Sequence, residues 1–207
     1  MSTKKFIAAQ LRKPSGFFGR FITVRFLNLV NVPLNRLTLE ILQLQPDDHV
    51  LEIGFGGGDL IARMARIVTH GHITGADFSI DAIEVCRKRF DTLMDVGTIE
   101  LRCASVEALP FNADTFTKAC TVNTIYFWPD PLAALGQIRR VLKQEGTLLV
   151  CFSPRAVMEK QEFTQHGFTL FEPEEVKSLL SKAGFRDVQL VFGRHRFGEC
   201  VVAKGIK

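Results

Sequence analysis

A chain of 207 residues is long enough for one ordinary domain, and 46% hydrophobic residues are enough to build a sizeable core. No apolar run reaches the length that spans a bilayer, and the five cysteines are scattered without a CxxC pair. These features argue against an integral membrane protein, a disulfide framework and a cysteine-based zinc site. We therefore expect a cytoplasmic protein in a reducing compartment.

The net charge of +4 is unevenly distributed along the chain. Seven basic residues and no acidic residue precede Glu40, which leaves −3 for the rest. Such an Arg-rich, acid-free start also fits a transit peptide by composition. A secretory signal is not expected, because Arg20 and Arg25 interrupt the apolar residues.

The first 33 residues are predicted to be helical and to close the active site. Residues 17–31 carry apolar side chains on nearly every face of a helix, so this helix should be covered on more than one side. The cover could be the main domain, an acceptor or a membrane surface that the arginines contact. The turn at residues 13–16 could hinge a first helix at residues 4–13 as a lid. The alternative is a helix packed on the edge of the core with no role in turnover.

From residue 34 onward, strands and helices alternate along the chain. Such βα repetition predicts an α/β fold with a doubly wound, mostly parallel seven-stranded sheet covered by helices. Residues 186–205 indicate two strands that turn between Gly193 and Gly198, which adds a C-terminal antiparallel hairpin. The other predicted strands are 47–55, 71–79, 98–105, 116–127 and 146–153, and the predicted helices are 35–45, 58–69, 80–93, 131–143 and 172–185.

The segment VLEIGFGGGDL, residues 50–60, ends the first predicted strand of this sheet. Its glycines permit a tight turn and let a ligand lie against bare amides at the start of a helix. A dinucleotide site would require a third glycine where Asp59 stands, and the Lys-Ser/Thr ending of a P-loop is missing. Acidic residues beside the loop would repel a pyrophosphate. The pattern therefore favours a cationic ligand with an adenosine-like body.

The E-x-G-x-G-x-G pattern at residues 52–58 resembles the first motif of class I S-adenosylmethionine-dependent methyltransferases. Further strand ends match in order: Asp77 ends the second strand, SVEALPF follows the third, and NTIYFWPDP follows the fourth. The stretch SVEALPF resembles the DAExLPF stretch of the ubiquinone/menaquinone-type C-methyltransferases and their small-molecule relatives. The resemblance covers residues 37–204 and implies a Rossmann-like fold with S-adenosylmethionine as cofactor.

The resemblance also implies roles for individual residues. Asp77 would hold the ribose hydroxyls, Glu52 the methionine end, and Phe78 the adenine face. Ser105 replaces the family's usual aspartate, which weakens the acceptor for the adenine amino group, and the backbone N–H of Val106 remains available. Simpler roles stay open: Asp77 as a helix N-cap, Asp59 as a favourable charge at a helix start, and Phe78 as core. The predicted cofactor-binding residues are Glu52, Gly54, Gly56, Gly58, Asp77, Phe78, Ser105, Val106 and Asn123.

The acceptor side is predicted from the aromatic triplet Tyr126, Phe127 and Trp128, which follows the fourth strand and would form the substrate wall, with a place in the core as the alternative. If the acceptor needs a general base, His166 is the predicted candidate and Tyr126 a weaker one. The alternative for His166 is an exposed loop histidine. The histidines show no ligand spacing, so no metal site is expected.

The predicted function is methyl transfer from S-adenosylmethionine to a small-molecule or lipid-related acceptor. The alternatives are an RNA or protein methyltransferase and a non-catalytic subunit that binds the cofactor. Nucleic acid is not an expected partner, whereas peripheral membrane contact through the N-terminal segment is a predicted variant. The predicted division is a lid at residues 1–33 and a methyltransferase domain at residues 34–207. The sequence does not predict the oligomeric state.

Overall fold

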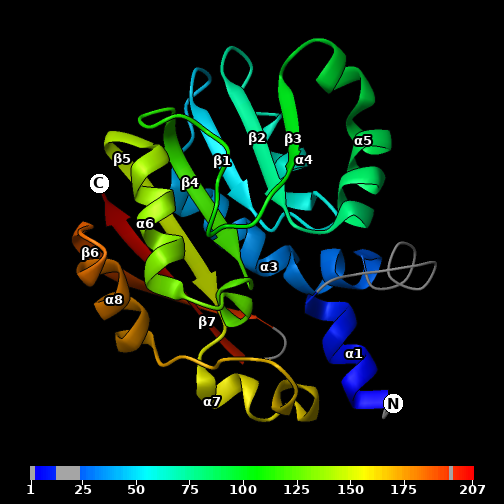
Figure 1. Ribbon diagram of the computed structural model, residues 1–207, viewed down its shortest axis with the longest axis vertical. Helices are drawn as coiled ribbons and strands as arrows, with labels where there is room; N and C mark the ends of the chain where they lie inside the picture. Colours follow the sequence, from blue (N-terminus) through cyan, green and yellow to red (C-terminus); the bar gives the residue numbers. More distant parts are fainter. Residues whose placement is uncertain (1–2, 13–23, 196–197) are drawn as a thin grey trace.

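The computed structural model describes residues 3–12, 24–195 and 198–207 (Figure 1). Strands and helices alternate through most of the chain, as the sequence predicts. The strands are β1 (His49–Ile53), β2 (His72–Asp77), β3 (Ile99–Cys103), β4 (Phe116–Val122), β5 (Leu142–Phe152), β6 (Arg186–His195) and β7 (Gly198–Ile206). The helices are α1 (Thr3–Arg12), α3 (Val24–Leu42), α4 (Asp59–Met64), α5 (Ile80–Asp95), α6 (Pro131–Val141), α7 (Arg155–Met158) and α8 (Pro173–Lys182), with the 3₁₀ turns η2 (Ile125–Phe127) and η3 (Glu162–Gln165).

The strands form one seven-stranded sheet in the order β3-β2-β1-β4-β5-β7-β6. The pairs from β3 to β5 are parallel, and β7 is antiparallel to both β5 and β6. The predicted doubly wound sheet with a C-terminal antiparallel hairpin is therefore confirmed. The chain runs outward from β1 in one direction and then from β4 in the other, so the switch point lies between β1 and β4.

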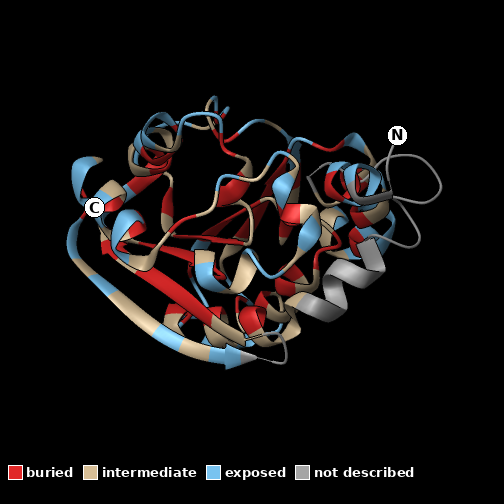
Figure 2. Cartoon of the chain, turned by 90° about the horizontal axis from the view of Figure 1, so that it is seen from below, coloured by how far each residue is buried: buried red, intermediate tan, exposed pale blue. Residues whose placement is uncertain are grey.

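Helices cover both faces of the sheet, and alternation along β5 assigns its residues to the two layers. Leu148, Val150 and Phe152 belong to one apolar cluster with α6 and α8, whereas Leu149 and Cys151 belong to a second cluster with α3, α4 and α5. Successive side chains of a strand point to opposite faces, which explains the division. Figure 2 shows buried residues concentrated in the sheet and on the inner sides of the helices. The sheet interior is thus fixed by packing on both sides.

The N-terminal part differs from the prediction at one point. A single helix, α3, runs from Val24 to Leu42 with Pro33 inside it, so it crosses the predicted boundary between residues 33 and 34. Leu34 and Leu42 are buried in the apolar cluster with α4 and α5, so the part of α3 from Leu34 onward packs on the core. The hinge at residues 13–16 and the aromatic residues Phe17, Phe18 and Phe21 lie outside the described residues.

No helix among the described residues is both long and apolar enough to cross a membrane.

Candidate active site

A pocket of about 250 Å³ opens at the carboxyl ends of β1, β2 and β4, at the switch point of the sheet. Open α/β sheets bind their ligands at this place. The described lining includes four carboxylates and neither lysine, arginine nor histidine. The carboxylates are Glu52, Asp59, Asp77 and Glu107. The described part of the pocket is therefore suited to a ligand that carries positive charge.

The three glycines of the loop after β1 serve different purposes. All three have positive φ, at 70° for Gly54, 52° for Gly56 and 71° for Gly58, which disfavours other residues. A Cβ on Gly54 would lie 2.4 Å from the Thr124 side chain, and one on Gly58 would lie 2.7 Å from the ring of Phe90. A Cβ on Gly56 would meet no atom within 4 Å, because this glycine faces open space. Gly56 therefore leaves room for a ligand to approach the backbone, while Gly54 and Gly58 permit close packing.

Asp77, at the end of β2, shapes the loop as well as lining the pocket. Its Oδ2 accepts a hydrogen bond from the Gly56 N–H at 3.0 Å, and its Oδ1 accepts one from the Ser79 N–H at 2.8 Å. A carboxylate oxygen can accept more than one hydrogen bond, so these two contacts are compatible with a ligand hydroxyl as a further donor. Ser79 Oγ accepts from the Ala82 N–H and caps α5, so the cap is not provided by Asp77.

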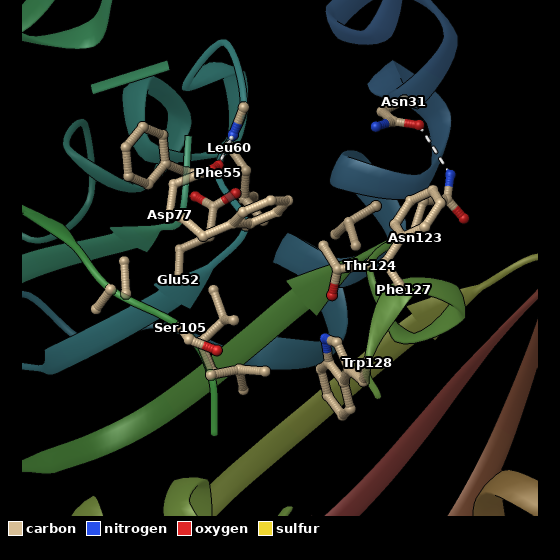
Figure 3. Close-up of a pocket in the computed structure, with 18 of the residues that line it drawn as sticks. Asn31, Glu52, Phe55, Leu60, Asp77, Ser105, Asn123, Thr124, Phe127 and Trp128 are labelled. Carbon is tan, nitrogen blue, oxygen red and sulfur yellow. Dashed lines mark hydrogen bonds between the residues drawn. The ribbon is translucent and has the colours of Figure 1, made fainter. Parts of the chain in front are cut away.

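Glu52 is the most unusual group of the pocket, because its carboxyl group is buried beside no positively charged side chain of the described pocket wall. The residue is 4% exposed, and among the described residues its Oε2 has no hydrogen-bond partner, although the backbone of Ile61 makes a hydrogen bond with the carboxyl group. Burial, with the nearby carboxylates of Asp77 and Asp59, raises the pKa of Glu52 from 4.5 to about 8. A buried carboxyl group of this kind is stabilised in its ionised form by a cation. Figure 3 shows Glu52 and Asp77 among the side chains that line the pocket. A positively charged ligand in the pocket would stabilise the ionised form of Glu52.

Asp59, by contrast, already has its partners. Its Oδ2 accepts hydrogen bonds from Arg63 Nε at 2.7 Å and from Asn35 Nδ2 at 3.0 Å. Burial alone would raise the pKa of Asp59, but these bonds outweigh burial and lower it. Asp59 therefore fixes α3 to the first turn of α4 and keeps its charge within the protein.

The remaining predicted cofactor residues also lie on the pocket wall. Phe78 is 40% exposed, which favours a ring available to a ligand over a core residue. Ser105 and Val106 line the pocket from the loop after β3, and Asn123 lines it from the end of β4. Of the predicted cofactor-binding residues, Gly58 alone is not among the described lining residues. The fold thus brings eight of the nine together, although their roles stay predictions.

The aromatic triplet is divided by the η2 turn. Phe127 and Trp128 line the pocket, whereas Tyr126 is 2% exposed and belongs to the core. The hydroxyl of Tyr126 donates to Ser153 O at 2.9 Å and accepts from the Ser153 N–H at 2.6 Å, and burial raises the pKa of its phenol. Tyr126 is thus not among the described lining residues, although its hydroxyl also lies 3.1 Å from Oδ1 of the lining residue Asn123; its predicted roles as substrate wall and base stay predictions.

His166 lies at the end of η3 and is not among the described residues that line the pocket. The same 3₁₀ turn contacts α1. His166 is half-buried, and its backbone N–H donates to Phe163 O at 3.2 Å. The catalytic role of His166 therefore stays a prediction.

One wall of the pocket comes from residues that the sequence did not single out. Leu11 of α1 and Asn31 and Asn35 of α3 line it. Asn31 Oδ1 accepts from Asn123 Nδ2 at 2.9 Å, which joins α3 to the end of β4 (Figure 3). The only sequence signal for the two asparagines is their spacing of four on one helix, which places both on one face.

Within the described part of the chain, no group of three or more His, Cys, Asp or Glu side chains could hold a metal ion.

A protein-family model described as "Methyltransferase domain" matches residues 50–146. The chain is 31% identical over 174 residues to an O-methyltransferase of Pyrenophora dematioidea, a match that covers 78% of this chain and 64% of the relative. It is 33% identical over 125 residues to the ubiquinone/menaquinone biosynthesis C-methyltransferase UbiE of Vibrio parahaemolyticus, covering 60% of this chain and 48% of the relative. The chain thus spans about half to two thirds of these relatives.

Among solved structures, the chain resembles an S-adenosylmethionine-dependent methyltransferase of Thermotoga maritima. The identity is 27% and the TM-score 0.70, and the match covers 92% of this chain and 97% of the other. This likeness extends over the sheet, the hairpin and most of the helices described above.

Proposed function

We propose that the chain transfers a methyl group from S-adenosylmethionine to a small-molecule acceptor, because residues 50–146 match a methyltransferase domain and the chain resembles the class I S-adenosylmethionine-dependent methyltransferases. The observation that carries this proposal is the buried carboxyl group of Glu52, whose Oε2 has no partner in the part of the chain that the structure describes. S-adenosylmethionine bears a sulfonium and an ammonium group, and either cation would stabilise an ionised Glu52.

The residues of the pocket fit this cofactor along its length. Glu52 would face the methionine end, and the open space at Gly56 would admit the ligand against the loop backbone. Asp77 would accept from the ribose hydroxyls, while Phe78 would pack on the adenine. A dinucleotide fits less well, because its pyrophosphate would lie among carboxylates without any described lysine or arginine in the wall.

When bound, S-adenosylmethionine supplies a methyl group that its sulfonium has already activated. The protein then has to orient an acceptor beside that group and exclude water, which accounts for much of the rate gain in such reactions. Phe127, Trp128 and Leu11 provide the apolar part of the wall that would exclude water. The hydroxyl of Tyr126 is hydrogen-bonded to Ser153 and lies close to Asn123 Oδ1, and a general base, if the acceptor needs one, stays a prediction for His166 or Tyr126.

Relatives of two kinds support a small organic acceptor: a fungal O-methyltransferase and a bacterial quinone-pathway C-methyltransferase. A lipid-related acceptor and membrane contact through the N-terminal segment stay predictions. Methylation of RNA or protein has the basic N-terminus as its only support.

Isothermal titration calorimetry tests the proposal. We expect micromolar binding of S-adenosylmethionine and S-adenosylhomocysteine and no binding of NAD. Tight NAD binding without a response to the methyl donor would contradict the proposal. Turnover of labelled cofactor with metabolite fractions then distinguishes an enzyme from a non-catalytic binding subunit.

A further inference from the structure

Trp128 places an unpaired hydrogen-bond donor on the wall of the pocket. The residue is 6% exposed and lines the pocket, and its indole N–H has no hydrogen-bond partner among the described residues. The described side-chain atoms that are both enclosed and unpaired are Thr38 Oγ1, Glu52 Oε2 and Arg155 Nε, so the indole nitrogen is not sealed inside the core. A buried indole N–H usually has a partner. A ligand in the pocket would supply the partner that the described residues do not.

The fold fixes the direction of this indole N–H. The ring of Trp128 belongs to the apolar cluster shared with α6 and α8, and its backbone N–H donates to Ile125 O at 3.3 Å. Figure 3 shows the indole nitrogen turned toward Thr124, across the pocket from Glu52 and Asp77. Because packing already holds the ring, little side-chain entropy remains to be lost when a ligand binds to it.

The neighbouring hydroxyl of Thr124 has no proton left to offer a ligand. It is hydrogen-bonded to the hydroxyl of Thr121, and Thr121 Oγ1 donates to Ile53 O at 2.9 Å. Since the proton of Thr121 is used in that bond, the bond between the two hydroxyls takes the proton of Thr124. Trp128 is therefore the donor that this part of the wall can present to a ligand.

The polar groups beside Trp128 carry no positive charge. The described lining holds neither lysine, arginine nor histidine, whose charged groups make the strong hydrogen bonds to carboxylates and phosphates. The other described donor on this side is an amide: Asn31 is joined to Asn123 through its Oδ1, and its Nδ2 has no described partner. Phe127 and Pro129 are apolar neighbours in the same wall. Neutral donors among apolar side chains suit a ligand oxygen that is uncharged, as in a phenol or a ketone.

We propose that the indole N–H of Trp128 donates a hydrogen bond to an uncharged oxygen of the methyl acceptor, which makes the acceptor an oxygen-bearing organic molecule of the phenol type. This inference rests on the proposed function. The proposed cofactor contacts Glu52, Asp77 and Phe78 lie at the ends of β1 and β2, whereas Trp128 follows β4. The competing explanations are that the indole N–H binds the cofactor, or that Trp128 provides only apolar surface.

Trp128 is the only tryptophan of the chain, so its indole N–H gives a single signal in a proton–nitrogen correlation spectrum. The full-length protein is saturated with S-adenosylhomocysteine and titrated with phenol or with toluene, which carries a methyl group in place of the hydroxyl. Phenol should shift the indole proton downfield and slow its exchange with water, because the proton becomes hydrogen-bonded. Toluene should do neither.

Trp128→Phe keeps an aromatic ring and removes the N–H. We expect it to weaken phenol binding by about two- to tenfold, the scale of one hydrogen bond, and to leave the affinities for toluene and S-adenosylhomocysteine nearly unchanged. Phe127→Leu is the matched control, because it alters the same wall without removing a donor and should weaken phenol and toluene alike. Circular dichroism confirms that each variant is folded, and the wild-type spectrum is informative without any variant.

Three results would overturn the inference. A loss of affinity for S-adenosylhomocysteine in Trp128→Phe would assign the indole N–H to the cofactor. Equal effects of phenol and toluene on the indole signal would leave Trp128 as apolar surface. Absence of phenol binding to the complex with S-adenosylhomocysteine would exclude an acceptor of this class. Absence of S-adenosylhomocysteine binding is a separate outcome, because it contradicts the proposed function, and this inference fails with it.

Discussion

The buried carboxyl group of Glu52 predicts that cofactor binding releases a proton. Its pKa of about 8 without ligand leaves about nine tenths of the molecules protonated at pH 7. A cation placed beside Oε2 stabilises the ionised form and lowers the pKa. Binding of S-adenosylhomocysteine, whose amino group is cationic, should therefore release up to about 0.9 proton at pH 7.

Glu52 also makes the free energy of unfolding depend on pH. The folded-state pKa of Glu52 is raised above its usual value, so the folded protein binds more protons than the unfolded chain between pH 4.5 and 8. The neutral carboxyl group of Glu52 stabilises the folded state fully below pH 4.5, and this stabilisation is lost as pH rises through 8. A shift from 4.5 to about 8 corresponds to a change on the order of 5 kcal/mol in the free energy of unfolding. Urea unfolding at pH 5 and pH 9 measures this difference.

Calorimetry in two buffers of different ionisation enthalpy measures the proton count. We expect Glu52→Gln to abolish the release and to flatten the dependence of unfolding free energy on pH. Glu174→Gln is the control, because this exposed glutamate lies on α8 and pairs with Lys177 away from the pocket. Binding without proton release in the wild type, or equal release in Glu52→Gln, would refute the reasoning.

Four further outcomes follow from the geometry of the site. Asp77→Asn should weaken S-adenosylhomocysteine binding by about 1.5–3 kcal/mol and also lower the unfolding free energy, because the carboxylate holds two loop N–H groups; calorimetry and urea unfolding measure both effects. Gly56→Ala should weaken S-adenosylhomocysteine binding at least about tenfold and lower the free energy of unfolding by roughly 1–2 kcal/mol. Gly58→Ala should mainly lower the free energy of unfolding, because its Cβ would collide with the ring of Phe90. Prolonged treatment with a chelator should leave calorimetric binding unchanged. Removing residues 1–12 should speed dissociation of S-adenosylhomocysteine in a stopped-flow assay, because Leu11 lines the pocket.

The sequence predicted best those parts of the site that follow directly from strand ends. Glu52, the glycines and Asp77 stand at the ends of two apolar segments, and parallel strands bring such ends together at one edge of the sheet. Their arrangement could therefore be inferred from spacing. The pKa shift of Glu52 could not be inferred, because it depends on burial and on two other carboxylates that only the folded loop brings close.

Tyr126 shows why the acceptor side was harder to predict. Three consecutive aromatic residues at a strand end give no indication of which ring turns inward. Their direction depends on the η2 turn, which buries Tyr126 against Ser153 and leaves Phe127 at the pocket. The contact between Asn31 and Asn123 joins residues 92 positions apart, and no local pattern indicates such a pair.

Of the two N-terminal helices, α3 is held by hydrogen bonds to the loops of the site, whereas α1 is the one that could move. Asn35 donates to Asp59 at the start of α4, and Asn31 is bonded to Asn123 at the end of β4. Together with the buried Leu34, these contacts fix α3 to both strand ends that form the switch point. A lid that included α3 would break two hydrogen bonds and expose core surface each time it opened. We therefore expect motion that admits an acceptor at α1, where Leu11 contributes to the pocket from a helix that packs on η3.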